Sequence, residues 1–234
     1  MGVNVVPKLA ERPSQSERDI RYNSPICTPS QAARLAEMPA NTVRAWTRAT
    51  KTRPAIVHTV ENAHRGWPSV PLVGVIETWS LRALRTAGIP MQKLTKVAEQ
   101  LREELKDPYV LARPLLFTDG IDLYRRDRGD LFRIEDGQQP IEQVIEKYLA
   151  RVEIDGDHEP TAFRIPLTQE IMLSIDPRFN AGRPSFEDSR TPAFAILGAL
   201  RGGDPPTIVA SDYNLTLEEV SAVENAQDWL AEIA

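Results

Sequence analysis

Cysteine and histidine are scarce in this chain of 234 residues, and their scarcity excludes several kinds of site. The single cysteine, Cys27, has no partner for an internal disulfide. The three histidines, His58, His64 and His158, show no metal-ligand spacing with it. We therefore expect no metal site and no cofactor, and we expect Cys27 to be an ordinary packed thiol.

Long hydrophobic runs are also missing. No apolar segment approaches the roughly 20 residues that cross a bilayer. Residues 1–9 lack the long apolar core of a secretory signal. The composition, 41% hydrophobic and 26% charged, is that of an ordinary soluble protein. These features predict a cytoplasmic protein, and the chain is long enough for the two domains that we expect.

The net charge of -5 hides an uneven distribution along the chain. Residues 1–110 contain 16 Lys and Arg against 10 Asp and Glu, a balance of +6, whereas the remainder contains 12 against 23, a balance of -11. A basic half suits a polyanion such as DNA, while an acidic half would be repelled from a duplex. The charge distribution therefore favours a nucleic acid as the partner of the front half, and self-association or another protein for the back half, although a soluble two-domain protein without these partners could be equally uneven.

Residues 28–46 carry the clearest motif, two short helices joined by a tight turn. Thr28 and Gln31 have the spacing of a capping box at the start of the first helix. On the second helix Val43 and Trp46 form an apolar face, and the opposite face carries Asn41, Arg44, Arg48 and Lys51. One face can pack while the other meets phosphates and base edges, which indicates a DNA-binding helix-turn-helix. The alternative is a small amphipathic hairpin with a solvated basic side.

The residues around this motif suggest an arm, a wing and two further helices. Residues 1–25 are polar and without period, which predicts a flexible arm. Two short β-branched runs, 53–60 and 70–73, flank a polar tip and indicate a hairpin, or wing. His64 and Arg65 lie at that tip, where they could touch DNA or could be exposed loop residues without a binding role. Trp67 is expected to pack. Apolar spacing predicts helices over 74–86 and 91–106.

The back half changes from strands to helices. Residues 109–168 predict a β-rich connection, with strands at 115–124, 131–134, 151–155 and 161–165 and a helix at 140–150. A second helix pair follows, with Asp204 and Thr216 as expected caps and Asn214 in the turn between them. Its exposed face is acidic, which is the wrong sign for phosphates. Its apolar residues indicate a surface for homodimerisation, formed by Val220, Val223, Trp229 and Leu230.

Two family resemblances rest on these residues. Residues 28–106 resemble a MerR-type winged helix, in the helix pair at 28–46 and in the run at 81–90. Residues 171–232 resemble a small antitoxin-associated domain, in Ile175-Asp176-Pro177-Arg178 and Gly182-Arg183-Pro184 before a helix-turn-helix. The combination resembles VapB-type antitoxins with a MerR-like head. This resemblance implies a repressor of its own operon that neutralises a PIN-domain ribonuclease.

The resemblance also implies roles for particular residues. It places DNA-facing positions on Asn41, Thr42, Arg44 and Arg48 and on the wing, in agreement with the cationic face. The DNA-binding candidates are thus Asn41, Thr42, Arg44, Arg48, Lys51, Arg53, His64 and Arg65. A PIN nuclease holds Mg²⁺ with carboxylates, and a guanidinium placed among them would block it. Arg183, Arg190 and Arg201 are the candidates for that contact, with hydrogen bonding inside the fold as the alternative.

We therefore expect a mainly α protein with small β elements (α+β). Its expected parts are a flexible arm at 1–25, a winged helix-turn-helix at 26–108, a β-rich connection at 109–168 and a C-terminal helical domain for dimerisation and toxin binding at 169–234. DNA binding and inhibition should then be separable near Pro166. Two other functions stay open. One is a ligand-responsive MerR-like regulator without a toxin partner. The other is a hydrolase using the cluster at 119–130 or His158, although no complete catalytic set can be assembled and we expect no enzyme.

Overall fold

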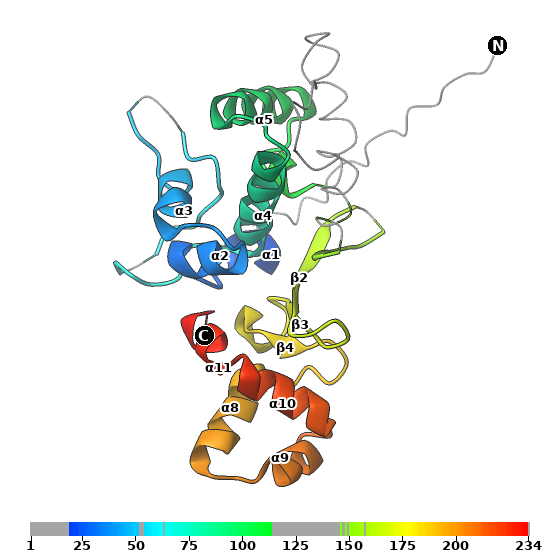
Figure 1. The fold of residues 1–234 in the computed structure, drawn as a ribbon. Helices are drawn as coiled ribbons and strands as arrows, with labels where there is room; N and C mark the ends of the chain where they lie inside the picture. Colours follow the sequence, from blue (N-terminus) through cyan, green and yellow to red (C-terminus); the bar gives the residue numbers. More distant parts are fainter. Residues whose placement is uncertain are drawn as a thin grey trace, which may run out of the picture.

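The computed structural model describes residues 19–51, 54–62, 64–113, 146, 148, 150–156 and 158–233. The strands predicted at 115–124 and 131–134, most of the helix predicted at 140–150, the acidic cluster at 119–130, residues 1–18 and Arg53 lie outside these ranges. Within them, helices form two groups around a small antiparallel sheet (Figure 1). This arrangement confirms the predicted α+β class.

The first group contains five helices and a short 3-10 turn. Their bounds are α1 (Ile20–Asn23), α2 (Pro29–Leu35), α3 (Ala40–Trp46), α4 (Leu72–Thr86), α5 (Met91–Leu105) and η1 (Val110–Ala112). The capping box of Thr28 and Gln31 forms as predicted, and Gly88 ends α4 with a φ of 84°. The predicted arm does not extend to residue 25, because the Asp19 side chain caps α1 and Tyr22 is buried.

The sheet consists of four antiparallel strands in chain order, β1 (Val152–Ile154), β2 (Pro160–Pro166), β3 (Met172–Ile175) and β4 (Ser185–Phe186). The predicted strands at 151–155 and 161–165 are therefore confirmed. Phe163 lies opposite Ile175, and Ile165 lies opposite Leu173, which gives one buried face. Arg164 is on the other face, where it pairs with Glu153 and Glu187 at 2.9 and 2.8 Å. The sheet crosses the boundary expected at 168, because β3 pairs with β2 and β4 pairs with β3, rather than a helical region beginning there.

The second group of helices follows the sheet. It comprises η3 (Asn180–Gly182), α8 (Ala193–Gly202), α9 (Pro206–Asp212), α10 (Leu217–Asn225) and α11 (Gln227–Ile233). Thr216 and Glu219 form the predicted capping box, and Asn214 adopts the left-handed conformation in the turn before it. Asp204 does not cap α9, because the helix begins one residue later and its N-cap is Pro205.

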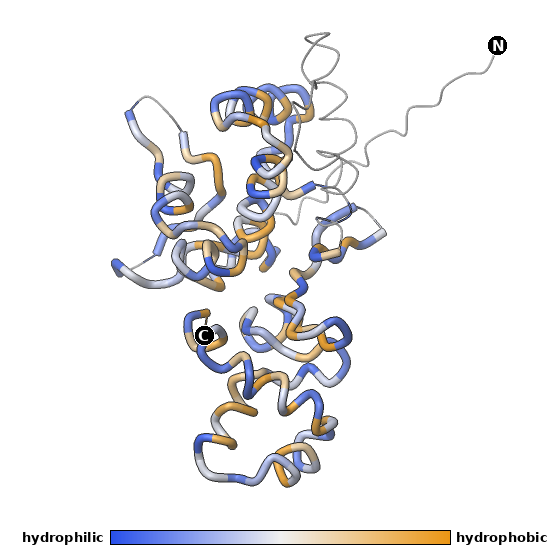
Figure 2. The backbone as a smooth tube through the Cα atoms, viewed as in Figure 1, coloured by the Kyte–Doolittle hydropathy of each residue, from blue (hydrophilic) through white to orange (hydrophobic). Residues whose placement is uncertain are grey.

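The two groups of helices share a continuous hydrophobic core. Hydrophobic residues recur along α2, α4 and β2, where the groups meet (Figure 2). Trp79 of α4 meets Phe163 of β2 edge to face, with ring centroids 5.9 Å apart. Cys27 is buried in this core, and burial raises the pKa of its thiol to about 12. It is the packed thiol that the sequence predicts.

Two further contacts bind the C-terminal part to the helix-turn-helix. Arg34 of α2 pairs with Glu232 of α11 at 2.6 Å. Gly182, with a φ of 74°, approaches the side chain of Ile26 so closely that an added Cβ would lie 2.5 Å from Ile26 Cγ2. In the described part of the chain, no helix has the length and apolar character needed to cross a membrane.

Candidate nucleic-acid interface

The turn between α2 and α3 is fixed by the backbone and by two ion pairs. Glu37 adopts a φ of 52°, and the Met38 N–H donates to the Ala33 carbonyl at 2.8 Å, which closes the end of α2. The Glu37 carboxylate accepts from Arg82 of α4 and from Arg151 before β1. These contacts hold the helix pair against the body of the protein.

Helix α3 presents its polar residues to solvent. Val43 and Trp46 are buried, whereas Asn41 and Arg44 are exposed and Thr42 is half-buried. The Arg44 guanidinium donates to the Ser30 hydroxyl at 2.8 Å. This bond orients Arg44 across the front of both helices. The apolar and polar faces predicted for the first two turns therefore exist.

Arg48 and Lys51 do not lie on α3, although the sequence suggested that they would. The helix ends at Trp46, whose carbonyl accepts from the N–H groups of both Ile56 and Val57. Residues 54–57 thus fold back onto the end of the helix and prevent its continuation. Arg48 and Lys51 remain exposed beyond it, and within the described ranges neither forms an ion pair.

The predicted wing is an irregular loop rather than a hairpin of two strands. Its only backbone bond across the loop, within the described residues, joins the Val60 N–H to the Ser69 carbonyl at 2.8 Å. Val70 instead bridges to Cys27. His64, Arg65 and Trp67 are exposed at the tip. Trp67 is 57% exposed, and its ring centroid lies 4.6 Å from that of His64, so the expectation that it is a packing residue rather than an exposed residue of the tip is wrong.

A buried carboxylate holds the base of this loop. Glu77 of α4 is fully buried and accepts the His58 N–H at 2.5 Å, while its other oxygen lies 3.5 Å from Arg102 of α5. Arg102 also donates to the Ile56 carbonyl at 2.7 Å. Burial raises the pKa of Glu77 to about 7 despite the attraction of Arg102 and the bond from His58. Burial likewise lowers the pKa of the His58 imidazole, with Arg102 adding to the effect.

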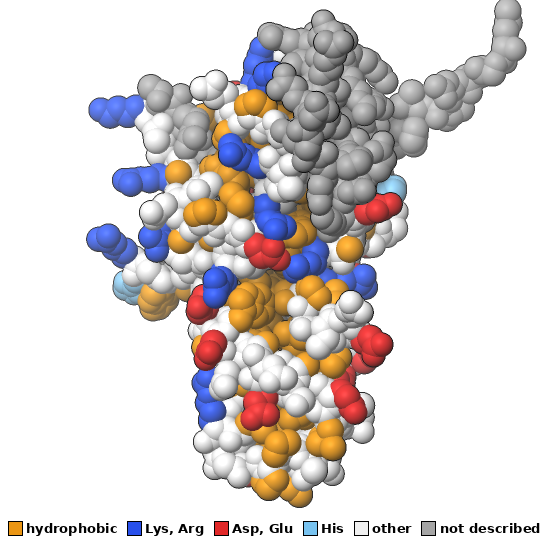
Figure 3. Space-filling model, in the orientation of Figure 1, with side chains coloured by type: hydrophobic (Ala, Val, Ile, Leu, Met, Phe, Trp, Pro, Cys, Tyr) orange, Lys and Arg blue, Asp and Glu red, His pale blue; other side chains and the backbone are white. Residues whose placement is uncertain are grey.

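Charge is distributed over the surface as the sequence indicated. Lys and Arg side chains project from the side that carries α3 and its loop, whereas Asp and Glu side chains mark the C-terminal helices (Figure 3). On the face shown in Figure 3, the side that carries α3 and its loop is therefore the one that would attract a polyanion. The interface candidate is therefore the outer face of α2 and α3 with the tip at 64–67.

The residues predicted for partner contact and dimerisation occupy different environments. Arg183 stacks on Phe194 at 4.8 Å and Arg190 on Phe179 at 4.4 Å, while Arg201 is exposed near the end of α8. Val220, Val223 and Leu230 are buried in the chain's own core, which accounts for their apolar character. Trp229 is half-buried, so of the four it retains the most surface for a second copy.

Two residues of the candidate interface were not singled out from the sequence for binding. Ser30 positions Arg44, but its hydroxyl was indistinguishable from other polar residues in the first turn of a helix. Trp67 was assigned to packing. A tryptophan next to Arg65 and Gly66, inside a polar tip, was the available signal that it lies at the surface.

Comparisons with known proteins agree with this geometry. Residues 25–97 match a family model described as "Putative DNA-binding HTH domain", and residues 173–224 match one described as "Protein of unknown function (DUF433)". The first match spans α2, α3, the loop and α4. The second runs from β3 into α10.

A curated relative and a solved structure extend the similarity to most of the chain. "Putative antitoxin VapB45" of Mycobacterium tuberculosis is 27% identical over 226 residues, which are 87% of this chain and 94% of that protein. The crystal structure of Rv2018 from Mycobacterium tuberculosis is 25% identical, with a TM-score of 0.72, and the match covers 87% of this chain and 99% of that one. The predicted resemblance to a VapB-type antitoxin with a helix-turn-helix is thus confirmed.

Proposed function

We propose that this protein is the antitoxin of a type II toxin-antitoxin system, which represses its own operon and neutralises a PIN-domain ribonuclease. The observation that supports this most directly is the exposed cationic face of a helix-turn-helix, in a chain similar to an antitoxin over 87% of its length. The protein would act in the cytoplasm, beside its operator.

DNA binding would use α3 and the loop that follows it. Asn41, Thr42 and Arg44 lie on the helix that enters the major groove in this class of motif. Arg48, Lys51 and Arg65 are exposed cations that can neutralise phosphates, and His64 accompanies them at the tip. Arg53 extends this set in sequence. A homodimer would place two such surfaces on a two-fold operator.

Toxin binding would use the C-terminal part. Its surface is acidic and suits a protein partner better than a duplex. A ribonuclease site that holds Mg²⁺ with carboxylates is blocked by a guanidinium. Arg183, Arg190 and Arg201 are the cations in this part without an ion pair among the described residues.

The DNA contact is tested with single variants of the full chain. We expect Arg44→Ala and Arg48→Ala each to weaken binding to the protein's own promoter by roughly 1–3 kcal/mol if the side chain reads a base, and by less if it meets phosphate. Arg201→Ala, an exposed arginine on α8, is the matched control. If the mobility shifts of both variants overlay that of the wild type at fixed salt, α3 and the segment that follows it are not part of the interface.

The proposed inhibition of the toxin is tested by growth rescue and by co-purification. Co-expression of the full chain should restore growth of cells in which the cognate PIN-domain ribonuclease is induced, and the two proteins should co-purify. Repression of the operon without rescue or co-purification would instead identify a regulator that has no toxin partner.

A further inference from the structure

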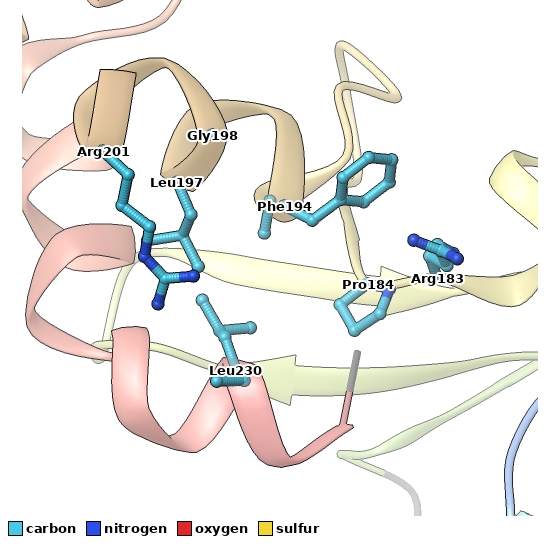
Figure 4. A pocket seen from close by; sticks show the side chains of 9 residues that line it. Arg183, Pro184, Phe194, Leu197, Gly198, Arg201 and Leu230 are labelled. Carbon is cyan, nitrogen blue, oxygen red and sulfur yellow. The ribbon is translucent and has the colours of Figure 1, made fainter. Parts of the chain in front are cut away.

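The C-terminal helices enclose a groove that no backbone or side chain of the described residues fills. It lies between α8 and α11, beside the turn that follows η3, and has a volume of about 120 Å³. Its floor and walls are apolar, with Pro184, Leu197 and Leu230 among them (Figure 4). Figure 4 shows Arg183 at one end and Arg201 at the other, with the apolar side chains between them.

Arg183 and Arg201 are cations in a part of the chain that is rich in carboxylates. Residues 169–234 contain four arginines, no lysine, and 11 Asp and Glu. Arg178 is paired with Asp176 at 2.7 Å, and Arg190 stacks on Phe179 away from the groove. Within the described ranges, neither Arg183 nor Arg201 forms an ion pair, although carboxylates are abundant nearby in sequence. Both ends of the groove are therefore positive in an otherwise acidic region.

The wall beside Arg183 is also preorganised. Phe194 of α8 is 43% exposed and supports the Arg183 guanidinium at 4.8 Å from its ring centroid. An exposed aromatic ring next to a positioned arginine is the composition found at the centre of protein interfaces. The ring leaves the guanidinium hydrogen atoms free to meet an anionic oxygen.

We propose that this groove docks a segment of the partner protein that carries one apolar side chain between two carboxylates. The apolar side chain would enter the space between Leu197 and Leu230, and the carboxylates would pair with Arg183 and Arg201. The partner is the toxin of the proposed function, on which the inference rests. A phosphate backbone fits less well, since it offers no apolar group and would meet the acidic surface around the groove.

The test uses the full chain and a defined probe. The probe is an acetylated, amidated peptide Asp-Glu-Phe-Glu-Asp, with Lys-Lys-Phe-Lys-Lys as its charge-reversed control. We expect amide NMR shifts of Leu197, Leu230 and Ala231 to move with the acidic peptide and not with the basic one. Arg183→Glu and Arg201→Glu should each weaken binding at least fivefold, and Phe194→Ala should weaken it as well.

Arg85→Glu is the control variant, because Arg85 is an exposed arginine on α4 that lies outside the groove. Circular dichroism verifies that each variant is folded. An equal loss of affinity in Arg85→Glu, equal binding of the basic peptide, or unmoved groove amides would overturn the proposal. So would a concentration-dependent dimer of the chain alone that Arg183→Glu and Arg201→Glu abolish, since a second copy would then be the occupant.

A second titration separates this inference from the proposed function. The PIN-domain partner should lose at least tenfold in affinity for the Arg183→Glu/Arg201→Glu chain and keep its affinity for Arg85→Glu. If that partner binds the double variant with full affinity, the proposal that the groove docks it is contradicted, while the antitoxin role is unaffected. If the peptide binds in an arginine-dependent way but no PIN-domain protein binds the chain, the result supports the docking proposal for the groove and contradicts the proposed function.

Discussion

Glu77 is a buried carboxylate whose ionisation opposes folding. Its side chain has no exposed surface, and one of its oxygens lacks a hydrogen-bond partner. Burial raises its pKa from 4.5 to about 7, so between these values the folded protein holds a proton that the unfolded chain releases. The resulting stability is fully present below pH 4.5 and is lost as the pH rises through 7. A shift of this size corresponds to about 3 kcal/mol.

The variant Glu77→Gln should therefore change the pH dependence of stability. Its amide keeps an acceptor for the His58 N–H and never ionises. We expect its free energy of unfolding, relative to the wild type, to rise by up to about 3 kcal/mol between pH 5 and pH 8. Urea denaturation at several pH values measures this difference. Glu99→Gln, at an exposed carboxylate on α5, is the control, and parallel curves for Glu77→Gln and the wild type would contradict the prediction.

At the scale of elements, the close contact of η3 with Ile26 gives a second prediction. An alanine at position 182 would need a φ of 74°, and its Cβ would lie 2.5 Å from Ile26 Cγ2. We expect Gly182→Ala to cost roughly 1–3 kcal/mol of stability, from backbone strain and overpacking together. Chemical denaturation monitored by tryptophan fluorescence measures the loss.

Two companion variants separate these causes. Gly156→Ala should leave stability nearly unchanged, because an added Cβ there meets no atom within 4 Å. Ile26→Ala combined with Gly182→Ala should cost less than the two single changes added together, because removing the Ile26 side chain relieves the clash. Strict additivity would mean that the contact with Ile26 contributes nothing.

The elements that the sequence predicts correctly are those with a local cause. The capping boxes at Thr28 and Thr216 need only residues three positions apart. The end of α4 at Gly88 is set by a residue that accepts a positive φ. The exposed face of α3 with Asn41 and Arg44 follows from its helical period. Each of these features could therefore be predicted from the local sequence, without knowledge of the tertiary structure.

The features that the sequence does not predict depend on distant partners. The end of α3 is set by residues 56 and 57, which return to bond the Trp46 carbonyl. The residues around the loop tip have strand propensity, yet Val70 bridges to Cys27 instead of to its expected neighbour. β3 joins the sheet because Phe163 and Ile165 need buried partners across from them. Tertiary packing overrides local propensity at each of these places.

At the scale of the whole molecule, the continuous core argues against a division into separable units near Pro166. β3 covers one side of β2, and α11 packs against α2. A chain that ends at Pro166 should expose Phe163 and Ile165, at a cost of roughly 1.5–3 kcal/mol for each. We expect it to unfold at a lower urea concentration than the full chain and to bind its operator more weakly. An unchanged urea midpoint would show that the front part folds on its own.

The assembly state gives a further prediction at this scale. A helix-turn-helix gains affinity when two copies meet a two-fold site, so we expect a homodimer of about twice 26.2 kDa. Trp229 keeps exposed surface, and Trp229→Ala should weaken the dimer, whereas Ile208→Ala, at an exposed residue of α9, should not. Light scattering at micromolar concentration measures the mass. A monomeric wild type would contradict the prediction.

Helix α11 faces a different neighbour on each of its sides. Leu230 and Ala231 line the groove, while Glu232 pairs with Arg34 of the helix-turn-helix. A ligand that displaces α11 from either side therefore alters the contacts on the other. Thermodynamic linkage then requires the two effects to be equal. The factor by which a bound partner changes the affinity for the operator is the factor by which a bound operator changes the affinity for the partner. If both proposed ligands shift α11, this seven-residue helix would couple the binding of one to the binding of the other.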